Sequence, residues 1–124
     1  MRSATPDPQS AAAAGPGAGA AASRLRVTVR ESPDSDPTTW MLSCDPPGGD
    51  HPDPAAACAA LAAADRPFDP VPPGTMCAQI YSGPQTATVH GTWQGRPVHA
   101  TYSRVDACET ARWAALAPLF RTPR

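Results

Sequence analysis

Four cysteines are the residues of this chain that could most readily do chemistry. They are Cys44, Cys58, Cys77 and Cys108, and no two of them form a Cys-x-x-Cys pair. An even set of this kind is typical of disulfides, and from sequence alone three pairings are possible. Because disulfides persist in oxidising compartments, the cysteines favour a secreted protein.

Reduced thiols that hold a metal ion together with His51, His90 or His99 are the alternative. However, the sequence lacks the ligand spacing of structural zinc sites. His51 lies in a turn between Asp50 and Pro52, where a structural hydrogen bond is a simpler role than catalysis. His90 and His99 fall at alternating strand positions, on a solvated face. We therefore expect no metal and no cofactor.

The motifs of common enzymes are also missing from the sequence. It contains no Gly-x-Ser-x-Gly elbow, no His-Glu-x-x-His and no phosphate-binding loop. Its carboxylates are scattered through turns, without a pair that could share acid–base work. Trp40, Trp93 and Trp113 are better explained as anchors of a small core than as a ligand platform. We expect a protein that is not an enzyme.

The charge balance limits the possible partners. The net charge is −1, without a long run of one sign, which argues against nucleic acid and anionic membranes. Arg24, Arg26 and Arg30 alternate along one segment and indicate a solvated strand face. No apolar stretch approaches the roughly 18–20 residues that span a bilayer. The 17 prolines of the chain suit rigid loops.

The first 23 residues differ in composition from the rest of the chain. They are rich in Ala, Gly, Pro and Ser, and such a segment buries too little apolar surface to offset its ordering entropy. We expect residues 1–23 to be a flexible tail and residues 24–124 to form one domain. The tail has no evident export signal, because a basic start and an apolar core are lacking.

The domain must position its cysteines on a small set of strands and helices. Alternation of apolar and polar residues predicts strands at 25–30, 38–44, 86–93 and 97–102. The last two form a hairpin around Gln94-Gly95. An alanine-rich helix is expected at 55–64, with Asp53 as its N-cap and Pro54 at its first position, and a second one at 107–116 with Pro118 beyond its end. This order predicts an α+β fold with an antiparallel sheet.

Three groups of residues resemble one known family. Residues 44–61 read CDPPGGDHPDPAAACAAL, residues 91–98 read GTWQGRPV, and the C-terminal part contains Cys108-Glu109, Arg112-Trp113 and then APLF at 117–120. Residue types and spacing are similar to those of the subtilisin inhibitor-like family of actinobacterial secreted proteins. The resemblance covers residues 25 to about 120.

The resemblance implies a five-stranded antiparallel sheet with two helices and two disulfides. By the pairing of the family, these would be Cys44–Cys58 and Cys77–Cys108. It also implies a secreted inhibitor of subtilisin-like serine proteases, and members of the family are often homodimers through the sheet.

The resemblance further implies a reactive-site loop at residues 75–81. The scissile bond of the family falls two residues after its third cysteine, which is Gln79–Ile80 here. The residues that would contact the protease around it are Met76, Cys77, Ala78 and Tyr81. A substrate-like loop of this kind inhibits when it is rigid, because a rigid loop loses little ordering entropy on binding.

Two residues depart from the pattern of the family. Gln79 stands where members more often have Met, Lys or Arg, which leaves the preferred protease open. Asp106 stands where members commonly have an Asn that braces the loop, and an ionised carboxylate accepts hydrogen bonds but cannot donate them. The exposed Gln79 also suggests an alternative: a non-inhibitory extracellular protein that is a transglutaminase substrate or binds another partner. Gln85 and Gln94 are further candidates for the reactive glutamine.

Overall fold

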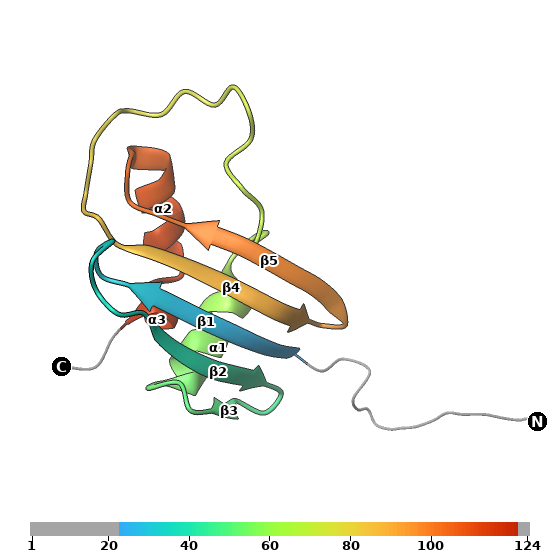
Figure 1. Cartoon of the computed structure of the whole chain (residues 1–124). Helices are drawn as coiled ribbons and strands as arrows, with labels where there is room; N and C mark the ends of the chain where they lie inside the picture. Colours follow the sequence, from blue (N-terminus) through green and yellow to red (C-terminus); the bar gives the residue numbers. More distant parts are fainter. Residues whose placement is uncertain (1–22, 122–124) are drawn as a thin grey trace, which may run out of the picture.

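A computed structural model describes residues 23–121 as a five-stranded sheet with helices packed on one face (Figure 1). The elements are β1 (Ser23–Arg30), β2 (Thr38–Cys44), β3 (Gly48–Gly49), α1 (Pro54–Ala63), β4 (Thr86–Trp93), β5 (Arg96–Tyr102), α2 (Ala107–Ala115) and α3 (Ala117–Phe120). The strand order is β3-β2-β1-β4-β5, and all neighbours are antiparallel. The predicted α+β class, the five-stranded antiparallel sheet and the two disulfides are confirmed.

The central strand β1 supplies the middle of the core. Leu25, Val27 and Val29 are at most 1% exposed, and the residues between them face the other side of the sheet. Antiparallel strands that alternate in this way bury one face and leave the other to solvent. The helices cover the buried face: α1 packs against β2, α3 against β1 and α2 against β5, and α1 and α3 lie behind the sheet in Figure 1.

Helix α1 begins where the sequence predicts. The Asp53 side chain accepts a hydrogen bond from Ala56 N at 3.2 Å, and Pro54 occupies the first turn. Leu61 and Cys58 lie on its buried side. The Cys44–Cys58 disulfide then joins the end of β2 to this helix, with the two Cα atoms 5.8 Å apart. Helix and sheet are thus linked covalently as well as by packing.

The buried His51 links the turn before α1 to α3. Its Nδ1 accepts a hydrogen bond from Asp53 N at 3.0 Å, and its Nε2 lies 2.9 Å from the carbonyl oxygen of Leu119. Because a backbone N–H can only donate, Nδ1 is the acceptor, and Nε2 carries the proton and donates to Leu119. The ring also packs edge-on against Trp40, with centroids 5.0 Å apart. His51 therefore has a structural position inside the fold.

Two details differ from the sequence-based expectations. A third, short helix, α3, follows α2, and Pro118 lies in its first turn. Proline fits the first turn because the N–H groups there have no intrahelical partner. Ser23, expected in the tail, is the first residue of β1, where its buried Oγ accepts a hydrogen bond from Gln94 N at 2.9 Å. The remaining tail, residues 1–22, lies outside the described residues, as do residues 122–124.

Tyr102 at the end of β5 closes the core beneath α2. It is 2% exposed, and its hydroxyl donates a hydrogen bond of 2.6 Å to the Pro67 carbonyl. Arg112 lies over the ring, 4.4 Å from its centroid. Burial raises the pKa of Tyr102 to about 12, and the nearby Arg112 charge lowers it by less. The phenolate form is therefore disfavoured in the folded protein.

This burial predicts a loss of stability at alkaline pH. Since the folded pKa of about 12 exceeds the usual value near 10, Tyr102 contributes stability that is complete below pH ~10. That contribution is lost as the pH rises through about 12. Tyr102→Phe should lower the free energy of unfolding by about 1–2 kcal/mol at neutral pH, because the Pro67 carbonyl loses its donor. Urea unfolding between neutral pH and about pH 11 should show a smaller alkaline loss for the variant, and equal losses would contradict this account.

Candidate functional site

A long loop without regular structure joins α1 to β4, and part of it is unusually exposed. In the segment 75–81, Met76 is 94% exposed, Ile80 61% and Tyr81 64%. In Figure 1 this connection is the yellow trace that runs out past α2. Large apolar side chains gathered in water are typical of a surface that binds another protein.

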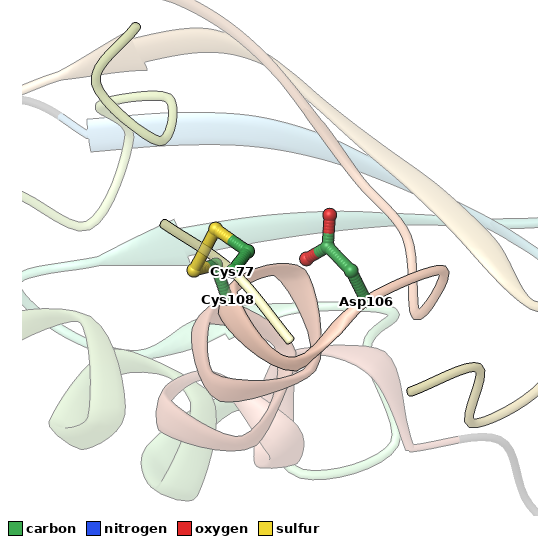
Figure 2. Close-up of side chains that lie close together, drawn as sticks. All are labelled: Cys77, Asp106 and Cys108. Atoms are coloured by element: carbon green, nitrogen blue, oxygen red, sulfur yellow. A yellow bond between two sulfur atoms is a disulfide. The ribbon is translucent and has the colours of Figure 1, made fainter. Parts of the chain in front are cut away.

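On its N-terminal side the loop is tied to the start of α2. The Cys77–Cys108 disulfide joins the two segments, with Cα atoms 5.5 Å apart. One residue later, the Ala78 carbonyl accepts a hydrogen bond of 2.9 Å from Ala107 N. Figure 2 shows the disulfide beside the first turn of α2. A covalent link and a main-chain hydrogen bond therefore hold consecutive loop residues.

On its C-terminal side the loop is tied to Arg104, which lies just before α2. Ser82 N donates a 2.8 Å hydrogen bond to the Arg104 carbonyl, and Arg104 Nη1 lies 3.5 Å from Gln85 Oε1. Both attachments of the loop thus reach residues 104–108, one before and one after the Gln79–Ile80 bond. If that bond were cut, each new end would still be attached to the body of the protein.

The main chain around Gln79 is itself folded into a tight turn. Ile80 N donates to the Ala78 carbonyl at 2.9 Å, a hydrogen bond across three residues. The Gln79 amide nitrogen donates to the Cys77 carbonyl at 3.2 Å, so the side chain folds back along the loop. At the start of the loop, both the N–H and the hydroxyl of Thr75 donate to one carbonyl. These local bonds reduce the number of conformations open to the loop.

Asp106 lies at this site but does not touch the loop through a hydrogen bond of its carboxylate. Its Oδ1 accepts from Glu109 N at 2.8 Å and so caps α2. The loop is instead held by the backbone N–H of the following residue, Ala107. Any support that Asp106 gives to the loop therefore acts through the first turn of α2, which carries both Ala107 and Cys108.

A carboxylate oxygen of Asp106 and the sulfur atoms of Cys77 and Cys108 lie within 4.8 Å of one another (Figure 2). Three such groups could in principle bind a metal ion. The two sulfur atoms are joined to each other, however, and a metal ligand must be a thiolate. In the oxidised protein this cluster is a disulfide beside a helix cap.

Helix α2 is fixed to the sheet by charged and aromatic contacts. Arg112 pairs with Glu109 at 2.7 Å and donates to the Thr101 carbonyl of β5 at 3.0 Å. On the same helix, Trp113 packs against Phe120 of α3, with ring centroids 4.7 Å apart. The segment that anchors the loop is therefore part of the rigid body of the domain.

The structure thus brings the predicted loop residues and the Cys77–Cys108 pair together with Asp106. His51 and the Cys44–Cys58 pair lie elsewhere, on the side of β2 and α1. Sequence reasoning missed the anchors Ser82, Arg104 and Ala107. These residues act chiefly through main-chain groups, which every residue type carries, so no motif could have indicated them.

Comparison with known families decides the relationship of this chain. The family model described as subtilisin inhibitor-like matches residues 21–107. The protein belongs to the subtilisin inhibitor-like family. The match includes both strands of the β4–β5 hairpin and the whole exposed loop, and ends at the first residue of α2.

Individual relatives come from streptomycetes. A protein of Streptomyces avermitilis is 46% identical over 69 residues, which cover 55% of this chain and 46% of that protein. Protease inhibitor SIL-V5 of Streptomyces luteoverticillatus is 36% identical over 72 residues, 55% of this chain and 66% of the inhibitor. The chain therefore spans about half to two thirds of the length of these two relatives.

A solved structure extends the similarity to the fold of an inhibitor. Sermetstatin of Streptomyces caespitosus, in complex with Bacillus licheniformis subtilisin, superposes with a TM-score of 0.52 at 28% identity. The comparison covers 82% of this chain and 99% of sermetstatin. The names of the two streptomycete relatives describe protease inhibitors. Among residues 23–121, no helix has the length and apolar character needed to cross a membrane.

The anchors predict how the loop responds to loss of its disulfide. The double variant Cys77→Ser, Cys108→Ser should lose about 3–4 kcal/mol of unfolding free energy, and its loop should become a good protease substrate. Limited proteolysis under native conditions, read by mass spectrometry, should find new cleavage within residues 75–81. The matched control is Cys44→Ser with Cys58→Ser, which removes the other disulfide and should leave loop cleavage unchanged while the protein stays folded. Equal loop cleavage in both variants would show that the Cys77–Cys108 bond does not control the loop.

Proposed function

We propose that this protein inhibits subtilisin-like serine proteases by presenting Gln79–Ile80 as a substrate-like bond that is cleaved slowly. The observation that carries the proposal is the double attachment of the exposed loop to residues 104–108, on both sides of that bond. Membership in the subtilisin inhibitor-like family and the fold similarity to an inhibitor bound to subtilisin support it.

Binding begins with the main chain of the loop. An extended segment can add to the edge of a protease cleft through backbone hydrogen bonds, while alternate side chains fill pockets. A free peptide loses much conformational entropy in this step. The loop loses less, because Cys77 and Ala78 are already held on one side and Ser82 on the other.

Slow turnover follows from the same attachments. When the protease attacks the Gln79 carbonyl, the new amine at Ile80 is the leaving group. Because Ser82 N donates a hydrogen bond to the Arg104 carbonyl, this amine stays close to the acyl carbon instead of diffusing away. Re-formation of the peptide bond then competes with hydrolysis, so the inhibitor is regenerated in the complex.

The side chains on the loop favour proteases with apolar pockets. Met76 offers a flexible apolar side chain, and Ala78 requires little room beside the bond. Gln79, at the primary specificity position, carries no charge, so an acidic pocket of the trypsin type has no cation to pair with. We place the protein outside the cell, where its two disulfides persist.

Two further expectations are separate from this proposal. A homodimer through the sheet and a Gln79 reactive toward transglutaminase both stay predictions, because neither the comparisons nor the contacts of the described residues favour them. The Gln79 amide donates to the Cys77 carbonyl of its own loop, a contact that an acyl-donor glutamine would have to give up.

Titration against subtilisin tests the proposal directly. Oxidised protein should inhibit at a ratio of one chain per protease when the enzyme is at nanomolar concentration. Mass spectrometry after long incubation should find cleavage only between Gln79 and Ile80. Rapid degradation at many bonds, or full enzyme activity at a large excess of the protein, would contradict the proposal.

Exchange of the residue at position 79 tests the specificity assignment. Gln79→Lys should improve inhibition of trypsin by about tenfold or more, because a lysine supplies the charged hydrogen bond that an acidic pocket lacks with glutamine. Gln79→Met should improve inhibition of subtilisin instead. The control Gln94→Lys adds the same charge at the β4–β5 turn and should change neither inhibition constant. Identical inhibition profiles for Gln79→Lys and the parent protein would show that another residue enters the pocket.

A further inference from the structure

The face of the sheet that carries no helix presents two histidines directly opposite each other. His90 of β4 pairs with His99 of β5 in the antiparallel register, and both side chains are exposed. Their ring centroids are 5.0 Å apart, with the ring planes inclined at 57°. In the part of the chain that the structure describes, neither imidazole makes a hydrogen bond, so their nitrogens are free to bind another group.

The register explains why the two rings are so close. Opposite residues in an antiparallel pair alternate between hydrogen-bonded and non-hydrogen-bonded positions, and side chains are closer at the latter. Pro97 has no N–H, so its pairing with Thr92 must be of the non-hydrogen-bonded kind. Two residues further along each strand, His90 and His99 therefore also form a non-hydrogen-bonded pair.

The turn beside this pair makes the spacing rigid. Gln94 and Gly95 both have positive φ, at 50° and 84°, the conformation of the two-residue turn that matches the twist of a hairpin. On its other side β4 pairs with β1 along its length. The two imidazoles are thus mounted on neighbouring strands of a continuous sheet.

The separation of the two imidazoles fits that of a metal chelate. Metal–nitrogen bonds of about 2.0–2.1 Å, at angles between square-planar and tetrahedral, place two ring centres about 4.5–5.2 Å apart. The observed 5.0 Å lies in that range. Imidazole is a preferred ligand of copper, nickel and zinc, and divalent copper binds such sites most tightly.

We propose that His90 and His99 chelate one divalent transition-metal ion on the open face of the sheet, with affinity in the order Cu²⁺ above Ni²⁺ and Zn²⁺. Water completes the coordination, because the exposed positions of β1, β4 and β5 around the pair carry no carboxylate. The site is independent of the reactive loop and of the proposed inhibition.

This inference departs from the expectation of no metal. That expectation rested on the spacing of structural zinc sites, which use four protein ligands and sequence-local pairs. His90 and His99 are separated by a hairpin turn, and only strand pairing brings them together. Arg26, opposite His90 on β1, places a positive charge beside the site. It should weaken binding of a cation, which gives the proposal a second testable consequence.

Calorimetric titration of the oxidised full chain with CuCl₂, NiCl₂ or ZnCl₂ at about pH 7.5 tests the site, since protons compete for the same nitrogens at lower pH. We expect one ion per chain. His90→Asn and His99→Asn should each lower the Cu²⁺ affinity by about tenfold or more, because the second linked ligand is lost. Arg26→Thr should raise the Cu²⁺ affinity a few-fold, because it removes one repulsive positive charge near the surface site.

Relocation of the pair supplies the matched control. The variant His99→Thr with Thr101→His keeps the number of histidines and the exposed face, but separates the two rings diagonally by about 7–8 Å. It should bind as weakly as His99→Asn. Adding His90→Thr and Thr88→His should restore binding, because Thr88 lies opposite Thr101 two residues along the same ladder. Urea unfolding of each variant checks that the fold is kept.

Three results would overturn the proposal. The first is equal affinity in the parent and in the diagonal variant, which would indicate binding elsewhere on the chain. The second is no measurable heat with Cu²⁺ up to about 1 mM. The third is one ion per two chains with a doubled mass in sedimentation, which would place the ion between copies and not within one hairpin.

Discussion

The proposed function of this structure depends on one constraint, the attachment of the exposed loop to residues 104–108. The Cys77–Cys108 disulfide and the Ala78 carbonyl hold the loop before the Gln79–Ile80 bond, and Ser82 holds it after that bond. A loop with large apolar side chains in water would otherwise adopt many conformations. Anchors on both sides restrict these conformations before binding. The loop therefore loses little ordering entropy when it binds a partner.

These anchors are only as rigid as the segment that carries them, and this links the loop to the core. Residues 104–108 connect β5 to α2, so they are fixed by the pairing of β5 with β4 and by the packing of α2. Arg112 contacts β5 through the Thr101 carbonyl and the Tyr102 ring, and Asp106 caps the helix. Substitutions in the core beneath α2 are therefore expected to act on the loop even though they do not touch it.

The two faces of the sheet have separate roles. The face beneath the helices forms the core, with Leu25, Val27 and Val89 essentially inaccessible to water. The open face carries polar residues whose neighbours are set by strand register alone. Burial of one face fixes the register, because a one-residue slip in pairing would move every side chain to the other face. This fixed register is the reason why residues such as His90 and His99 meet. Alternation therefore determines the core and, indirectly, what the open face displays.

The sequence by itself determined the α+β class and the positions of the long elements, because period-two alternation, the Asp53-Pro54 start of α1 and the Gln94-Gly95 turn are local signals. Together with the family resemblance it also located the loop. It did not indicate the short helix α3, whose first turn contains Pro118, because proline both follows and begins helices and only packing of the next turn decides between them. The tertiary structure alone decided which groups brace the loop and which histidines meet, since main-chain donors carry no residue signature and cross-strand neighbours follow from register.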